Sequence, residues 1–442
     1  MGGRADIASR EASMSSTENV IPDGYDRRPV PQSETVSGVG LALITFGIGM
    51  TLPVFWLGAD VTQKVGFASA ALIFAGVCGA LGLLCALTAM VGVRTRLSTY
   101  MVLQFSFGRH GAKLINLIMA VTLLGFYAAT ADIFGSTVAS ALQSSWDIVT
   151  PAWVHSVWGS VLMTLMAIYG LRGLDRLSIV SVPLMALFML FALYLGVQRA
   201  APGQLGGFVG AGDSLALAIA STIGMVVLTP VLMPDFTRYA RTERDALIAI
   251  LGMVIGFPFV LIVGGLLSII TGQSEIMLIM ASLGVLLPAL AVLVFSTWIT
   301  NTANLYSATL TLATVSRTPS WKLTVAGSVL ATGLAVGGFM SHFLDFVMTL
   351  SIVIPPLASI YVADFFVVRQ QRYDVDALAQ SGAFGWPALV SWALASLVAW
   401  MTTFAGWTLT TQPTLDSLLV ALVAYLLLQR LSRVSTVAPS HS

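Results

Sequence analysis

The stretch LALITFGIGMTLPVFWLG, residues 41–58, decides the fold that we expect for this chain. It is apolar enough to lie in a membrane, yet Gly47, Gly49 and Pro53 fall within seven residues. A proline removes one backbone donor and clashes with the preceding helical turn. In hydrocarbon such a break is tolerated only where protein or a water-filled cavity meets the freed backbone. The stretch therefore predicts a broken membrane helix.

A second stretch, IGMVVLTPVLMP at residues 223–234, repeats this pattern far downstream. Gly224 precedes Pro230 by six positions, as Gly47 precedes Pro53. Two interrupted hydrophobic segments at corresponding places in two halves of a chain indicate the central binding site of a transporter. An ordinary kinked helix is the alternative for either segment alone, because prolines are common in membrane helices. The matched spacing favours the transporter.

Composition places the whole chain in a membrane. Of its 442 residues 57% are hydrophobic and only 9% are charged, whereas a soluble domain carries about 25% charged residues. We expect a disordered cytoplasmic N-terminal tail at 1–34, with no signal peptide, and a cytoplasmic tail at 434–442. Cys78 and Cys85 are two helical turns apart, too far for a disulfide within one helix, so we expect them to be packing residues.

Charge-free runs predict twelve spans, since a spanning helix needs about 20 apolar residues. We expect an all-α integral membrane protein whose third span continues through Asp132 to about residue 142, with one long helix within 275–317. If the N-terminus is cytoplasmic, 19 of the 21 Lys and Arg residues fall on inside segments, and only Lys64 and Arg199 fall outside. This distribution follows the positive-inside rule. It predicts a multi-pass protein of the plasma or inner membrane with both termini cytoplasmic.

The two broken helices also predict an internal repeat. The first broken helix starts inside and the sixth span starts outside, so a unit of five helices recurs upside down. We assign 35–200 to the first repeat, 201–370 to the inverted second repeat, and 371–433 to two appended helices.

A polar cluster in the eighth span, STWITNTANLYS at residues 296–307, is the most informative candidate site. Asn301 and Asn304 are one helical turn apart and are expected to share a face. Carboxamides offer both donors and acceptors, which suits a planar ligand with alternating N–H and C=O groups. Hydroxyl and backbone oxygens suit a small hard cation such as Na⁺. A polar seam that holds helices together is the alternative, and the cluster alone does not decide between the two.

Three further features carry separate hypotheses. Phe126 and Tyr127 in the third span are candidates for a stacking platform, with simple packing as the alternative. Asp132 lies inside an apolar span, where a carboxylate is costly, so proton coupling is one hypothesis and hydration at the outer interface is the other. Asp235 and Arg238 are expected to form an i, i+3 ion pair that caps the sixth span or closes an inner gate.

Other functional classes find little support in the sequence. The four histidines are scattered, no HExxH-type motif occurs, and no metal-ligand spacing is present, which argues against a membrane-embedded enzyme. No large soluble domain or repeated filter sequence suggests a sensor or a channel. We expect no cofactor, no metal beyond a coupling Na⁺, no nucleic acid, and no obligate protein partner; membrane lipid, a solute and a coupling cation are the expected partners.

Four segments carry a family resemblance: residues 97–135, MPDFTRYAR at 233–241, WITNTANLYSATL at 298–310, and IPPLASIYVADFF at 354–366. In order and spacing they resemble the nucleobase–cation symporter-1 family, nearest its cytosine permease branch. The resemblance implies a LeuT-like fold, a 5+5 inverted repeat plus two C-terminal helices. It implies import by alternating access of a flat heterocycle, driven by Na⁺ or H⁺. The solute would be a pyrimidine such as cytosine or hydroxymethylpyrimidine, a purine, or a hydantoin.

By position, the resemblance also implies a cation site. Its ligands would be the backbone carbonyls of Gly47 and Met50, the carbonyl of Ser296, and the hydroxyl of Thr300. Ile299 stands where Na⁺-coupled members carry a hydroxyl. One expected ligand is therefore missing, which leaves H⁺ coupling open.

Together with the polar cluster, the resemblance gives a set of substrate-binding residues: Thr51, Phe126, Gly224, Val226, Leu228, Asn301 and Asn304. Cytosine permeases carry serines and an aromatic residue in the sixth-span break, where this chain is apolar from Met225 to Leu228. They also carry an aromatic residue at the position of Thr51. The pocket is therefore expected to differ from theirs, and a related heterocycle is as good a candidate as cytosine.

Overall fold

The computed structural model describes residues 28–169, 174–316, 318–375, 378 and 382–437. Within these ranges the chain is helical, with a single isolated bridge between Val36 and Ala240 and no β-strand. Residues 1–27 and 438–442 of the two predicted tails, and 170–173 of a predicted cytoplasmic loop, lie outside the described residues.

The helices follow the predicted spans. Eight helical stretches in the described part of the chain are long and apolar enough to cross a membrane, and the pair α2–α3, bent by 60°, forms one more broken span. Three shorter apolar helices, α6, α9 and α15, lie in three further predicted spans. The bounds are α2 Gly38–Gly49, α3 Leu52–Val65, α4 Phe67–Thr95, α5 Thr99–Trp146, α6 Ala152–Tyr169, α7 Leu174–Arg199, α8 Gln204–Gly207, α9 Leu215–Val226, α10 Leu228–Val231, α11 Met233–Thr237, α12 Glu243–Thr271, α13 Ile276–Ser282, α14 Leu286–Val315, α15 Ser320–Val336, η4 Phe339–His342, α16 Phe343–Val353, α17 Pro355–Ala363, η5 Asp364–Val368, α18 Trp386–Phe404 and α19 Pro413–Val437.

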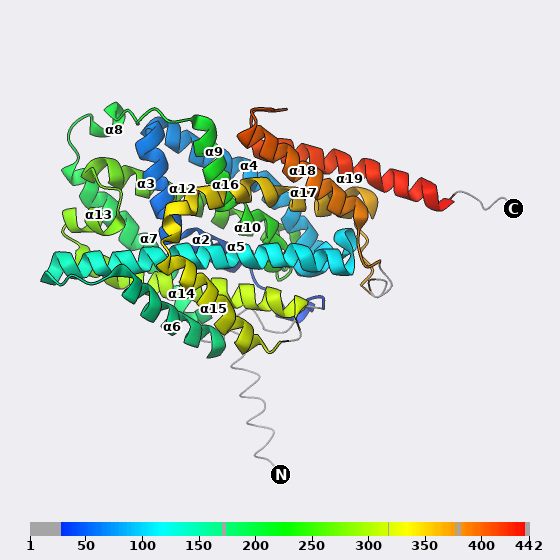
Figure 1. Ribbon diagram of the computed structural model, residues 1–442, viewed down its shortest axis with the longest axis horizontal. Helices are drawn as coiled ribbons and strands as arrows, with labels where there is room; N and C mark the ends of the chain where they lie inside the picture. Colours follow the sequence, from blue (N-terminus) through cyan, green and yellow to red (C-terminus); the bar gives the residue numbers. More distant parts are fainter. Residues whose placement is uncertain (1–27, 170–173, 317, 376–377, 379–381, 438–442) are drawn as a thin grey trace, which may run out of the picture.

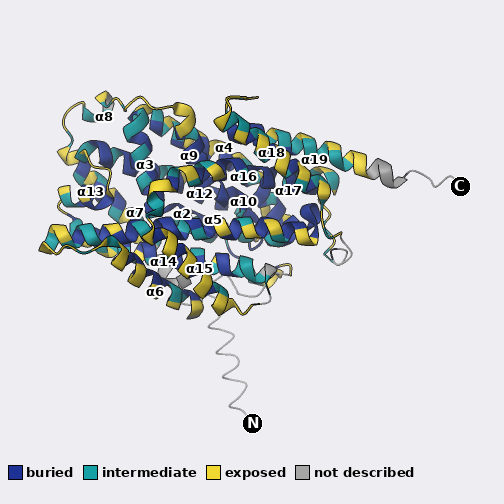
Figure 2. Cartoon of the chain, in the orientation of Figure 1, coloured by how far each residue is buried: buried dark blue, intermediate teal, exposed yellow. Residues whose placement is uncertain are grey.

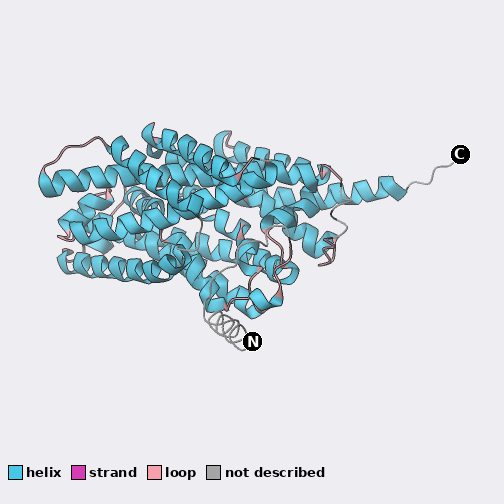
Figure 3. Cartoon of the chain, turned by 90° about the horizontal axis from the view of Figure 1, so that it is seen from below, coloured by secondary structure: helices cyan, strands magenta, loops and turns pink. Residues whose placement is uncertain are grey.

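Many of the helices, α5 among them, run along the long axis of the molecule (Figures 1 and 3), whereas α3 and α9 run across it in Figure 1. The third span is the part of α5 that follows a kink at Gly108; it runs through Asp132 as predicted and continues to Trp146 (Figure 1). Buried residues gather inside the bundle, and exposed residues lie on its outside (Figure 2). Large apolar side chains are among the exposed ones, including Leu72 and Leu330. An apolar exterior is what a helix bundle surrounded by lipid requires.

Small residues bring the first and seventh spans into backbone contact. A Cβ atom on Gly252 of α12 would lie 2.0 Å from the carbonyl oxygen of Ala42 in α2. One on Gly264 would lie 2.3 Å from the carbonyl oxygen of Phe55 in α3. Membrane helices associate through such close packing because lipid offers no hydrophobic drive between them. Both halves of the broken first span therefore lie against the one continuous helix α12.

The predicted long helix within 275–317 is α14, and a short helix that was not predicted, α13, precedes it across Gly284, which has a left-handed backbone (φ +72°). One sequence expectation needs correction. Residues 28–34, assigned to the tail, lie against the folded chain: the Val30 side chain is buried, and its N–H donates to the Arg96 carbonyl over 3.0 Å.

Candidate functional site

The first predicted break is confirmed at Met50 and Thr51, between α2 and α3. The Met50 N–H donates to the Gly47 carbonyl over 3.0 Å, and the Thr51 N–H donates to the Gly49 carbonyl over 2.9 Å. Pro53 lies in the first turn of α3, where a missing N–H leaves no helical bond unmade. The sequence therefore ends one helix and starts the next within two residues.

The second predicted stretch is divided into three short pieces, α9, α10 and α11, with interruptions at Val227 and Leu232. Tyr361 of α17 donates its hydroxyl to the carbonyl of Val231 over 2.9 Å. A side chain from the tenth span thus supplies a partner to the backbone of this irregular segment, as an interrupted helix in hydrocarbon requires.

An aromatic cluster joins the third span to the tenth. Phe126 of α5 makes edge-to-face contacts with Phe343 and Phe346 of α16, at ring-centroid distances of 6.3 and 5.4 Å. Trp56 of α3 contacts Phe343 at 5.9 Å, and Phe339 contacts Phe346 at 5.4 Å. We call these five residues the aromatic cluster. Such arrangements suit the charge distribution of aromatic rings.

The helix α16 also packs closely against Gly224. A Cβ atom there would lie only 1.6 Å from the carbonyl oxygen of Val347 in α16. Phe126 is half-buried, whereas Val226 and Leu228 are buried. Two predicted substrate residues from distant parts of the sequence, Phe126 and Gly224, therefore both lie against α16, together with Trp56 from the segment that follows Thr51.

Asn301 is fully buried in the seam between α14, α5 and α6. Its Nδ2 donates to the Tyr127 carbonyl over 3.1 Å and lies 3.5 Å from the Met163 sulfur, whereas its Oδ1 has no hydrogen-bond partner. Asn304 and Thr300, four residues apart, are only half-buried. The geometry of the Asn301 amide nitrogen matches the polar-seam alternative, while its unpaired oxygen leaves one acceptor unused.

The predicted cation ligands form two pairs. Gly47 and Met50 lie together at the first break, where a Cβ on Gly47 would approach Val182 of α7 to 2.7 Å. Ser296 is buried and Thr300 is half-buried, one turn apart on α14. The meeting of the two pairs in one cation site stays a prediction.

The predicted charged residues bond to neighbouring helices. Asp132 accepts the backbone N–H of Met340 over 2.9 Å. Asp235 accepts the backbone N–H of Thr99, the first residue of α5, over 2.9 Å. Arg238 donates from Nε to the backbone carbonyl of Asp235 over 3.2 Å. Asp235, at the end of the sixth span, thus caps the first part of α5, the helical segment that precedes a kink at Gly108.

Sequence reasoning missed a buried carboxylate cluster around Asp364. Its fully buried carboxylate accepts hydrogen bonds from the hydroxyls of Tyr425 (2.7 Å) and Tyr373 (2.9 Å) and from Arg369 Nε (3.1 Å). Arg369 also donates to the carbonyl of Phe105 in α5 over 2.7 Å. The sequence did carry a signal, because Asp364 is a single carboxylate at the end of an apolar segment. The reasoning applied to Asp132 could have been applied to it as well.

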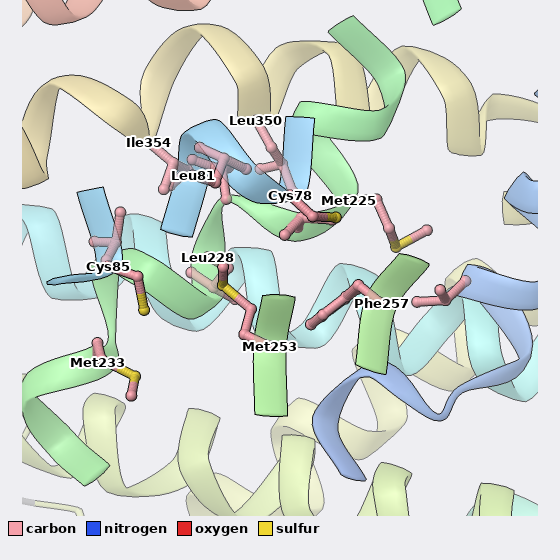
Figure 4. Packing of buried hydrophobic residues seen from close by; sticks show 14 of the residues in the cluster. Cys78, Leu81, Cys85, Met225, Leu228, Met233, Met253, Phe257, Leu350 and Ile354 are labelled. Carbon is pink, nitrogen blue, oxygen red and sulfur yellow. The ribbon is translucent and has the colours of Figure 1, made fainter. Parts of the chain in front are cut away.

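Both cysteines are free and buried. Figure 4 shows Cys78 and Cys85 of α4 among apolar side chains of the second broken stretch, including Met225 and Leu228, with Met253 of α12 nearby. Both belong to the hydrophobic core, as expected for packing residues.

The sequence matches the family described as permease for cytosine/purines, uracil, thiamine and allantoin over residues 29–427. The chain belongs to this family. Its members are permeases, so the chain is a multi-pass membrane transporter for nucleobase-like solutes rather than an enzyme. A cytosine permease of Escherichia coli strain K12 is 26% identical over 386 residues, which cover 84% of this chain and 88% of the relative.

Solved structures support the LeuT-like fold. An inward-facing conformation of Mhp1 superposes with a TM-score of 0.82 at 17% identity, covering 95% of this chain and 96% of that one. A closed conformation of the same nucleobase-cation-symport-1 transporter, with bromovinylhydantoin bound, gives 0.78 at 18% identity over 92% and 95% of the two chains. A Na⁺-coupled sialic acid symporter gives 0.65 at 12% identity over 97% of each.

Proposed function

We propose that the protein imports a flat heterocycle by cation-coupled alternating access. The observation that carries this proposal is the position of α16. It lies over Phe126 of the third span and over Gly224 at the second break, and it contacts Trp56 beyond the first break. A helix that touches all three predicted solute-binding segments suits a lid that closes over a bound solute from the outer side.

The solute that this arrangement favours is a ring with polar edges. Phe126 offers an aromatic face or edge, and a planar ring stacks on such a group. The half-buried Asn304 and Thr51 supply hydrogen-bonding groups, whereas Val226 and Leu228 supply apolar walls. We propose a pyrimidine such as cytosine or hydroxymethylpyrimidine, a purine, or a hydantoin as the transported class.

The proposed coupling ion is Na⁺ or H⁺. The residue that bears on the choice between them is Ile299. Its side chain has no oxygen, so a Na⁺ site would rest on Gly47, Met50, Ser296 and Thr300 alone. Proton coupling needs a titratable group instead, and Asp132 is the candidate within the membrane. Both versions place the protein in the plasma or inner membrane with both termini cytoplasmic, because that orientation follows the positive-inside rule.

Thermal stabilisation of the purified protein tests the proposal. A ligand that binds only the folded state raises the melting midpoint by mass action. We would screen nucleobases, hydantoins, allantoin and aminopyrimidines with and without Na⁺ at two pH values, and we expect at least one monocyclic or bicyclic heterocycle to stabilise. A panel without any stabilising compound would contradict the proposed solute class.

Matched variants identify the ion. Thr300→Val removes a hydroxyl at constant volume, and Thr311→Val does the same farther along α14. If Na⁺ binds at the predicted site, only Thr300→Val abolishes stabilisation by Na⁺. Stabilisation that is indifferent to Na⁺ but shifts with pH would support proton coupling instead.

A further inference from the structure

Asp132 has a role in the structure that proton coupling does not require. It is half-buried in a membrane-spanning helix, where a carboxylate persists only with a partner. Its Oδ2 accepts the backbone N–H of Met340 over 2.9 Å. An ionised carboxylate is a pure acceptor, and a backbone amide is a pure donor, so the two groups are complementary.

Met340 belongs to the η4 turn, which connects α15 to the lid helix α16. The turn follows Gly338, whose left-handed backbone (φ +77°) ends the preceding segment, and no side chain of the adjoining residues caps it. The first N–H groups of a helical turn have no partner inside it. Asp132 therefore caps this turn from a different helix.

The cap lies on the same pair of helices as the aromatic cluster. Phe346 packs against Phe126 and against Gly125, whose Cβ position would lie 2.5 Å from the Phe346 ring. Asp132 lies six residues farther along α5 and holds the turn before α16. The third span thus contacts the lid helix through rings and holds its starting turn through a carboxylate.

We infer that Asp132 is a positioning residue: its carboxylate fixes the η4 turn to α5 and so sets where the lid helix α16 begins relative to the third span. This role deepens the proposed transport cycle and rests on it. It requires a hydrogen-bond acceptor at position 132 and does not require a titratable group. That difference separates it from the proton-coupling hypothesis.

Asn and Ala at position 132 distinguish the two roles. Asn retains an acceptor oxygen but has no group that can be protonated and deprotonated. Ala has neither an acceptor nor a titratable group. Hydrogen–deuterium exchange of the peptide that covers residues 338–343 reports the cap directly, and uptake into proteoliposomes over a pH series reports transport. Asp345→Ala, which removes an exposed carboxylate from the first turn of α16, is the control.

We expect Asp132→Ala to speed exchange at Met340 by at least about tenfold, the loss of one charge-assisted hydrogen bond, and to reduce uptake. Asp132→Asn is expected to keep exchange within about threefold of wild type and to keep the pH profile of uptake. Unchanged exchange in Asp132→Ala overturns the cap. An Asn variant with wild-type exchange but lost uptake or an altered pH profile overturns the positioning role in favour of the titratable one.

The uptake assay and the exchange experiment test different statements, so either can give a negative result without the other. If no heterocycle is transported by the wild-type protein, the proposed function is wrong, while the exchange experiment still accepts or rejects the cap. If Asp132→Ala does not fold, the Asn variant alone decides, because the two hypotheses predict opposite results for its uptake.

Discussion

Replacing Gly224 by alanine tests whether closure needs backbone contact between α9 and α16. The added Cβ would lie 1.6 Å from the Val347 carbonyl oxygen, whereas real Cβ contacts essentially never fall below 3.0 Å. The difference means that one helix must withdraw by about 1.4 Å. Packed interiors do not absorb such a shift freely, and overpacking costs about 1–3 kcal/mol. That penalty applies only to the arrangement in which the helices touch.

A penalty of this size lowers the population of the closed arrangement about 5- to 150-fold relative to the open one. We therefore expect Gly224→Ala to reduce uptake into proteoliposomes about tenfold or more, and to weaken equilibrium binding of the solute as well, because a solute held under the lid favours the closed arrangement. Gly79→Ala on α4 is the matched control, since nothing lies within 4 Å of its Cβ position. It also corrects for the higher helix propensity of alanine. Wild-type uptake by Gly224→Ala would refute the reasoning.

Three further predictions follow from buried contacts. Asn301→Ala should lower the free energy of unfolding by about 1–3 kcal/mol in denaturant or thermal melts; a wild-type Kd for the solute in that variant would remove Asn301 from the substrate site. Tyr425→Phe, which deletes a 2.7 Å hydrogen bond to Asp364, should cost about 1.5–3 kcal/mol of stability by the same measurement, and an unchanged melt would show that the bond adds nothing. Cys78 and Cys85 should resist a maleimide in the folded protein and react once it is unfolded; mass spectrometry that finds labelling of the native protein would contradict their burial.

Local chemistry made the breaks and spans predictable. The effect of glycine and proline on the backbone reaches only a few residues along the chain. The end of α2 and the start of α3 could therefore be predicted from Gly47, Gly49 and Pro53 without knowledge of the fold. Long apolar runs are equally local. The division of 275–317 into α13 and α14 was missed because one glycine in a left-handed conformation, Gly284, leaves little trace in an apolar sequence.

The arrangement of side chains was less predictable because it depends on distant partners. Arg369 bonds to Asp364 and, across 264 positions of sequence, to Phe105. The exact rotation of α14 decides whether Asn301 faces the seam or a solute, and hydropathy does not specify that rotation. The polar cluster predicted that functional polar side chains would lie on the eighth span. Which neighbouring residue each of them contacts can be learned only from the fold.

The contact of both halves of the first span with α12 has a consequence for the proposed ion site. Because Gly252 and Gly264 hold α2 and α3 against one uninterrupted helix, the 60° bend cannot change unless α12 also deforms. In the proposed transport cycle, the peptide groups at Met50 and Thr51 would then keep the same mutual orientation. The entropy of arranging them is lost when the protein folds, so an ion at the proposed site would not have to order them again. Discrimination among ions would then depend on what α14 contributes.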